Sequence, residues 1–127
     1  MTEEWTAHLG RAEATVQAVK PMLARHEYPD DVRTVLVIGF ITQVIERHEI
    51  MLLFVSNDMR GSACVMARSI FESLYRGLWI IYCATDAQVS QFVGDDPMPV
   101  NIAEMASAID GATNTEGFFT NTRYCWQ

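Results

Sequence analysis

The amino-acid sequence predicts an all-α protein, an antiparallel helical bundle of three long helices plus shorter C-terminal helices. Apolar residues recur every three or four positions along most of the chain, which is the period of one side of an α-helix. No run shows the strict alternation expected of a β-strand. Short segments rich in turn-forming residues separate the periodic stretches, so consecutive helices are expected to pack antiparallel.

The first long helix is expected to begin after Thr2, whose hydroxyl can accept from an unpaired backbone N–H of the first turn. Its apolar side is a narrow stripe with steps of four and three residues: Trp5, Leu9, Ala12, Val16, Val19 and Leu23. Pro21 lies inside this pattern and has no backbone N–H to donate. We therefore expect a kink at Pro21, or a break just before it.

The second and third long helices are expected over about 31–56 and 62–84, joined by the turn SNDMRG. The seam of the second helix consists of Val37, Ile41, Val44, His48, Met51 and Val55. A shorter helix, AQVSQFV, should end at Gly94. Another should begin after Asn101, because Asn101 and Glu104 have the spacing of a capping box. The segment GATNTEG is interpreted as a linker before an aromatic tail.

The composition is that of a globular chain, and its 127 residues are expected to form one domain, 1–127. Half of the residues are hydrophobic and 20% are charged. The net charge of −7 argues against general binding to nucleic acid or to an anionic membrane, since both require a basic surface. Lys20 is the one lysine among nine basic residues, and a local arginine patch would still suit RNA.

The three cysteines, Cys64, Cys83 and Cys125, are odd in number and have no CxxC spacing, which favours a reducing cytoplasm. The N-terminus lacks the apolar core of a signal peptide, and the apolar runs are too short to cross a bilayer. Neither His8 nor His26 belongs to a metal-binding constellation, so we expect no metal. There is also no glycine-rich phosphate loop, and we expect no cofactor.

A charged row runs through the apolar stretch ARSIFESLYRGLWIIYCA, where Arg68, Glu72 and Arg76 recur every four residues. One interpretation is the solvated side of an amphipathic helix, with pairs that each contribute a few tenths of a kcal/mol. The other is a partly buried polar row that lines a groove or a subunit interface. Two features favour the second: both cations are arginine, and apolar residues share the same arc, namely Val65, Trp79 and Cys83.

His48 lies on the apolar seam of the second helix, next to Arg47 and Glu49. A histidine on such a seam is most often a hydrogen-bonded core residue. It is also the best candidate in the chain for acid–base chemistry. The candidate binding residues are therefore Arg68, Glu72, Arg76 and His48, with no catalytic set assigned.

The stretch RGSACVMARSIFESLYRGLWI (60–80) resembles a motif of bacterial proteins of unknown function, in which Arg-Ser-x-x-Glu precedes an aromatic run. Some of those proteins look like HEPN domains, and this resemblance implies a dimeric helical bundle of toxin or phage-defence systems, with RNA cleavage in active members. Their catalytic signature is an arginine followed, after four to six residues, by a histidine. No arginine of this chain has that spacing.

Two functions remain open on the sequence. The first is a non-catalytic, homodimerising module in bacteria that binds a protein partner or a small ligand. The second is an HEPN-like RNA-processing or toxin protein that uses the candidate residues, and only this one involves RNA. Because NTRYCWQ is an abrupt end for a bundle, the chain is also read as a possible fragment of a longer protein.

Overall fold

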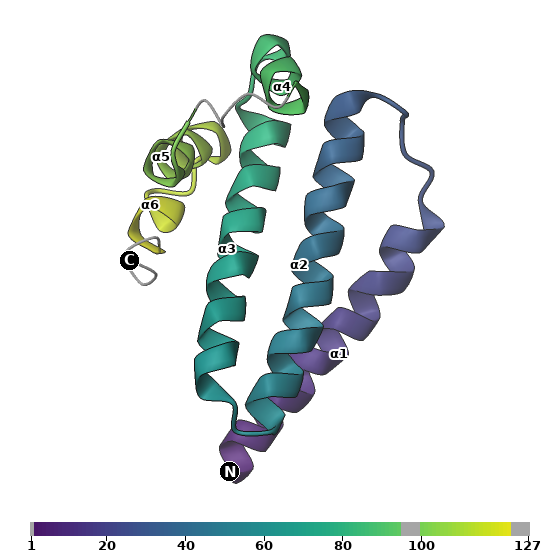
Figure 1. Cartoon of the computed structure of the whole chain (residues 1–127), viewed down its shortest axis with the longest axis vertical. Coiled ribbons are helices and arrows are strands. Elements are labelled where there is room, and N and C mark those ends of the chain that lie inside the picture. Colours follow the sequence, from purple (N-terminus) through teal and green to yellow (C-terminus); the bar gives the residue numbers. More distant parts are fainter. Residues whose placement is uncertain (1, 95–99, 123–127) are drawn as a thin grey trace. The chain divides into compact units, whose positions relative to one another are not determined.

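The computed structural model describes residues 2–94 and 100–122, and within these ranges the regular structure is all helical (Figure 1). The prediction of an all-α bundle with three long helices is confirmed. The helices are, in order, α1 (Glu3–Arg25), α2 (Val32–Ser56), α3 (Arg60–Tyr82), α4 (Asp86–Val93), α5 (Ile102–Thr113) and α6 (Phe118–Thr122).

α1 begins where the sequence predicts, because Thr2 accepts a hydrogen bond from the Trp5 backbone N–H at 3.3 Å. The predicted break before Pro21 does not occur: α1 continues through Pro21 to Arg25. Pro21 lies only one turn from the end of the helix. A single missing hydrogen bond there interrupts little of the helix, and Arg25 adds a favourable positive charge to the last turn.

α2 and α3 form a helical hairpin (Figure 1). Asp31 starts α2 by accepting from the backbone N–H and the hydroxyl of Thr34, at 3.0 and 2.6 Å. The hairpin turn contains Asp58 in the left-handed region, at φ 56°. α3 then begins at Arg60 and ends at Tyr82, two residues earlier at each end than the sequence predicts.

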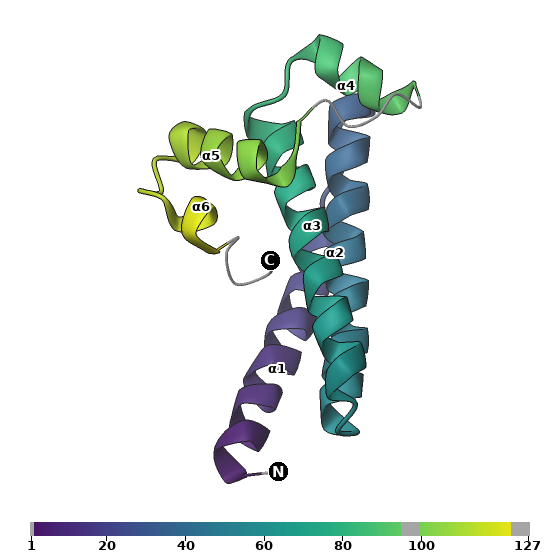
Figure 2. The ribbon, with the colours of Figure 1, turned by 60° about the vertical axis from the view of Figure 1, so that its left-hand side comes forward.

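Capping explains the shorter helices. Thr85 and Gln88 form a capping box at the start of α4, and Gly94 caps its end as predicted. The predicted box of Asn101 and Glu104 starts α5. The sequence does not predict α6, which lies in the segment interpreted as an aromatic tail and packs against α5 (Figure 2).

The chain divides into two compact units, and both long helices of the hairpin contribute to each. The first unit contains Met1–Tyr28 and Thr42–Phe71. Its described residues include three that are buried: Val16, Ala63 and Ile70. An ion pair between Lys20 of α1 and Glu49 of α2 joins its helices.

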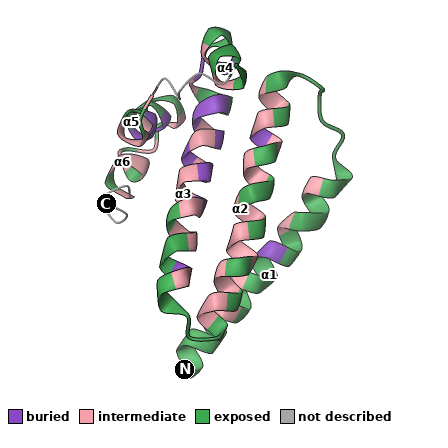
Figure 3. Cartoon of the chain, viewed as in Figure 1, coloured by how far each residue is buried: buried purple, intermediate pink, exposed green. Residues whose placement is uncertain are grey.

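The second unit contains Pro29–Ile41 and Glu72–Gln127, and it holds most of the buried side chains (Figure 3). They come mainly from α3 and α5, and include Tyr75, Trp79, Ile80, Met105, Ala106 and Ile109. Gly77 is buried against Phe40, and a Cβ placed on Gly77 would lie 3.2 Å from the Phe40 Cβ. A side chain at position 77 of α3 would therefore fit only if Phe40 moved by a few tenths of an ångström.

None of the helices in the described ranges is both long and apolar enough to span a bilayer.

Candidate functional site

The charged row of α3 is graded in its exposure. Arg68 is exposed, whereas the side chains of Glu72 and Arg76 each retain 37% of their accessible surface. The Arg76 Nη1 lies 4.0 Å from the Glu72 Oε2, so the structure places these two side chains together as an i,i+4 pair. A half-exposed pair at this distance contributes about 0.3–0.5 kcal/mol.

The apolar residues that share this arc of α3 have two different environments. Val65 retains 69% of its accessible surface, whereas Trp79 retains 3% because it belongs to the core of the second unit. Cys83 is half-buried, and this burial raises the pKa of its thiol. The arc is therefore solvated at one end of α3 and buried at the other. In the first unit, Val65 is an apolar side chain that remains exposed.

His48 is half-buried on α2, in the first unit. Its role as a core residue or as an acid–base group stays a prediction. Among the residues that the structure describes, no three His, Cys, Asp or Glu side chains lie close enough together to hold a metal ion.

The Glu72–Arg76 pair is better suited to binding a charged partner than to transferring a proton. An arginine side chain stays protonated in proteins and acts as a donor of hydrogen bonds. Such a pair is suited to complementary charges on a partner.

Two polar residues that sequence reasoning missed each make several hydrogen bonds within the second unit. The Arg33 Nη1 donates to the backbone carbonyls of Ile80 and Ala84, the latter at 2.8 Å, and its Nη2 donates to the Asp86 Oδ1 at 2.8 Å. These bonds satisfy one carbonyl in the last turn of α3 and one just after the helix, at a position where intrahelical partners run out. The position of Arg33 in the first turn of α2 gives no signal of this role.

The second missed residue is Asp110, near the end of α5. Its carboxylate accepts four hydrogen bonds from the segment that leads into α6. The donors are the Thr115 hydroxyl, the Phe119 backbone N–H and both the backbone N–H and the hydroxyl of Thr120. Asp110 therefore holds α6 to α5, and no motif in the sequence marks these contacts.

Residues 41–118 match a family of unknown function, DUF6988, and this range covers more than half of the chain. The matched range contains the α2–α3 turn and all four candidate residues. It agrees with the expectation of an uncharacterised family. No curated protein and no solved structure matches the chain.

Proposed function

We propose that this chain, which belongs to the DUF6988 family of unknown function, is a non-catalytic module that forms a homodimer through its first unit. The observation that carries the proposal is the contrast between the few buried residues of that unit and the large apolar side chains it exposes. Exposed apolar side chains that gather on one surface are typical of interfaces.

The relevant surface lies on the α2–α3 hairpin and consists of Ile50, Leu53 and Val65, which we call the hairpin patch. These side chains retain 41%, 63% and 69% of their accessible surface. All three positions belong to the first unit.

One hydrogen bond supports a patch that is shared by α2 and α3. The Arg47 Nη1 donates to the Ser69 backbone carbonyl at 3.4 Å, so α2 and α3 approach each other at these residues. Ile50 follows Arg47 by three residues, and Val65 precedes Ser69 by four. These spacings keep residues on the same side of a helix. Ile50 and Val65 therefore each lie about one turn from this contact between α2 and α3, and both are exposed.

α1 covers a different side of α2. Glu49 pairs with Lys20 of α1 and is the residue immediately before Ile50. Successive residues of a helix are about 100° apart, which turns Ile50 away from the position that α1 occupies. Ile50 is therefore accessible to a partner without displacing α1. Leu53 follows Glu49 by one turn and lies closer to the side that α1 covers, but it retains 63% of its accessible surface.

Charges beside the patch favour a second copy as that partner. Glu46 precedes Ile50 by four residues and Arg68 follows Val65 by three, and both are exposed. In a two-fold symmetric interface each copy uses the same surface, so Glu46 of one copy can pair with Arg68 of the other, twice. Such pairs offset the repulsion between two chains of net charge −7. This assigns Arg68, a candidate from the sequence, to the rim of an interface.

The apolar contribution is tested by light scattering on purified protein at tens of micromolar. We expect wild type to have the mass of a dimer and Val65→Glu to have the mass of a monomer, because the new charge would be buried in the interface. Met22→Glu is the matched control and should remain dimeric. Met22 is exposed on α1 and lies about 200° around that helix from Lys20, which contacts α2. A monomeric wild type, or a dimeric Val65→Glu, would contradict the proposal.

The rim charges are tested by reversal. Glu46→Arg and Arg68→Glu should each weaken the dimer, because each places like charges together. The double variant should restore it. Dimers of equal stability in all four proteins would rule out this pairing.

We place the module in the bacterial cytoplasm. The resemblance around Arg68 points to bacteria, and Cys64 and Cys83 are free thiols, as a reducing compartment favours.

The competing HEPN-like function is tested with the same protein. Cleavage of RNA by wild type that is lost in Arg68→Ala would contradict a non-catalytic module.

A further inference from the structure

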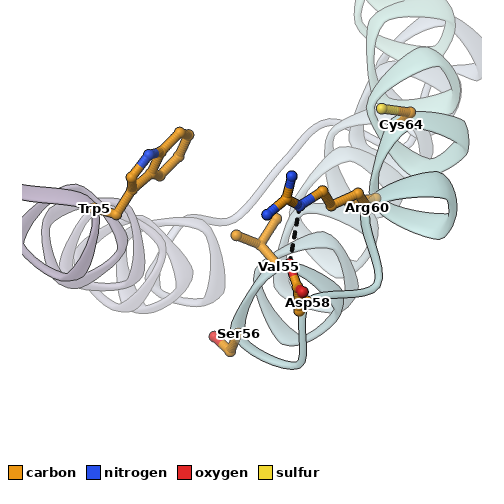
Figure 4. A pocket seen from close by; sticks show the side chains of 7 residues that line it. Trp5, Val55, Ser56, Asp58, Arg60 and Cys64 are labelled. Atoms are coloured by element: carbon orange, nitrogen blue, oxygen red, sulfur yellow. Dashed lines mark hydrogen bonds and ion pairs between the residues drawn. The ribbon is translucent and has the colours of Figure 1, made fainter. Parts of the chain in front are cut away.

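The first unit contains a cavity of about 690 Å³ where the α2–α3 turn approaches the start of α1 (Figure 4). Trp5 of α1, Val55 of α2 and Ala63 of α3 form apolar parts of its wall. Asp58 and Arg60 supply charges at the turn. The volume lies within the range of small-molecule sites, which combine apolar walls with a few polar groups.

The guanidinium of Arg60 forms an ion pair with Asp58 at the turn, and the two side chains retain 87% and 81% of their accessible surface. Its Nε donates to the Asp58 Oδ1 at 2.9 Å. Asp58 reaches this position because the turn places it in the left-handed region, at φ 56°. The two terminal nitrogens of Arg60 point away from Asp58 (Figure 4). A guanidinium oriented in this way presents a planar pair of donors, which matches the geometry of a carboxylate.

Trp5 supplies the aromatic part of the site. Its side chain projects from α1 opposite Arg60 and Val55 (Figure 4), and it retains 57% of its accessible surface. Exposure of an indole to water has a free-energy cost. A planar apolar ligand that covers the ring removes this cost. Val55 and Ala63 extend the apolar surface.

From these features we infer that the cavity binds an aromatic monocarboxylate, with its ring against Trp5 and its carboxylate on the terminal nitrogens of Arg60. The inference goes beyond homodimerisation and does not depend on it. Trp5 and Cys64 line the cavity, whereas neither belongs to the hairpin patch. The charges of the site favour an anionic ligand. A cationic ligand would be repelled by Arg60, and the carboxylate of Asp58 is already paired with Arg60.

The test is calorimetric titration of the full chain with three probes of matched shape. They are 1-naphthoate, neutral 1-naphthalenemethanol and cationic 1-naphthylmethylammonium. We expect 1-naphthoate to bind most tightly. Arg60→Gln should weaken 1-naphthoate binding about tenfold, which is the loss of one charge-assisted interaction, and leave the neutral probe nearly unchanged.

Three further variants complete the design. Asp58→Asn should tighten 1-naphthoate binding several-fold, because it removes a competing carboxylate while asparagine still accepts the left-handed backbone. Trp5→Ala should weaken all three probes. Arg25→Gln, an exposed arginine at the end of α1, is the matched control and should change none of them.

Tightest binding of the cationic or the neutral probe would overturn the inference. So would equal loss of 1-naphthoate binding in Arg60→Gln and Arg25→Gln, or no measurable binding of any probe at millimolar concentration. Circular dichroism of each variant establishes that it is folded. A monomeric wild type would leave this result intact, so failure of the dimer and failure of the site are distinguishable.

Discussion

Replacing Asp110 by asparagine tests how the C-terminal part of the second unit is held. The Asp110 Oδ1 accepts from the Thr115 hydroxyl at 2.6 Å and from the Phe119 N–H at 3.0 Å. The Oδ2 accepts from the Thr120 N–H at 2.8 Å and from the Thr120 hydroxyl at 2.6 Å. An amide has only one oxygen, so its NH₂ group would face two donors.

The structure sets the size of the effect. Burial alone would raise the pKa of Asp110, but the hydrogen bonds from Thr115, Thr120 and Phe119 outweigh it and lower the pKa from 3.8 to about 2. That difference corresponds to roughly 2.4 kcal/mol, and partial exposure of the carboxylate reduces the contribution to about 1–2 kcal/mol. With the unpaired donors added, Asp110→Asn should cost about 2–3 kcal/mol at neutral pH.

The sign of the pH dependence follows from the lowered pKa. The folded state keeps Asp110 charged at a lower pH than the unfolded state does, so the stabilisation is complete above pH 3.8 and is lost as the pH falls towards about 2. The free energy of unfolding of wild type should therefore approach that of Asp110→Asn over this interval. The difference between the two proteins should shrink by about 1–2 kcal/mol.

Urea denaturation followed by circular dichroism, at a series of pH values, measures this difference. Hydrogen exchange of the Phe119 and Thr120 amides provides a local readout, because α6 can open without global unfolding. Asp30→Asn, at an exposed position before α2, is the control and should change stability by less than about 0.5 kcal/mol. A loss below about 0.5 kcal/mol for Asp110→Asn, with unchanged exchange of both amides, would refute the reasoning.

Three other substitutions are tested by the same denaturation assay. Arg33→Met should cost about 2 kcal/mol, because carbonyls at the end of α3 lose a charged donor; a neutral result would contradict this capping role. Gly77→Leu should cost about 1–3 kcal/mol because its side chain would collide with Phe40, whereas Gly10→Leu, where an added Cβ meets nothing within 4 Å, should cost nothing; equal effects would refute this. Glu72→Ala should cost less than about 1 kcal/mol and be weakened further by salt, and a larger loss would show that the pair is more buried than its exposure indicates.

The helices could be predicted because their signals are local. The period of the apolar residues gives the three long helices, and the side chains of Thr2 and Asn101 mark two of the starts. Of the two outcomes expected at Pro21, a kink or a break, the break does not occur. Pro21 lies near the end of α1, where the loss of one hydrogen bond does not end the helix.

Contacts between distant residues could not be predicted in the same way. Arg33 reaches the carbonyls of Ile80 and Ala84, which are 47 and 51 residues away. Asp110 stabilises α6, a helix of five residues that has too few internal hydrogen bonds to form by itself. Neither the period nor the spacing of residues carries this information.

In the candidate site, too, local features could be predicted and features that depend on distant contacts could not. Four-residue spacing correctly indicates that Glu72 and Arg76 lie together, because the spacing belongs to one helix. The different exposures of Val65 and Trp79, on the same arc of α3, depend on which unit each belongs to. The cavity beside Trp5 depends on where α1 meets the α2–α3 turn, and no motif marks it.

Cross-linking tests the central claim, that two copies meet through the hairpin patch. Single cysteines are placed at Leu53, Val65 or Met22 in a chain whose own cysteines are replaced by serine, and each protein is treated with a short bismaleimide. We expect Leu53→Cys and Val65→Cys to give covalent dimers at low micromolar concentration, and Met22→Cys to stay monomeric. Equal yields at all three positions, or no covalent dimer at Leu53 and Val65, would contradict an interface on this surface.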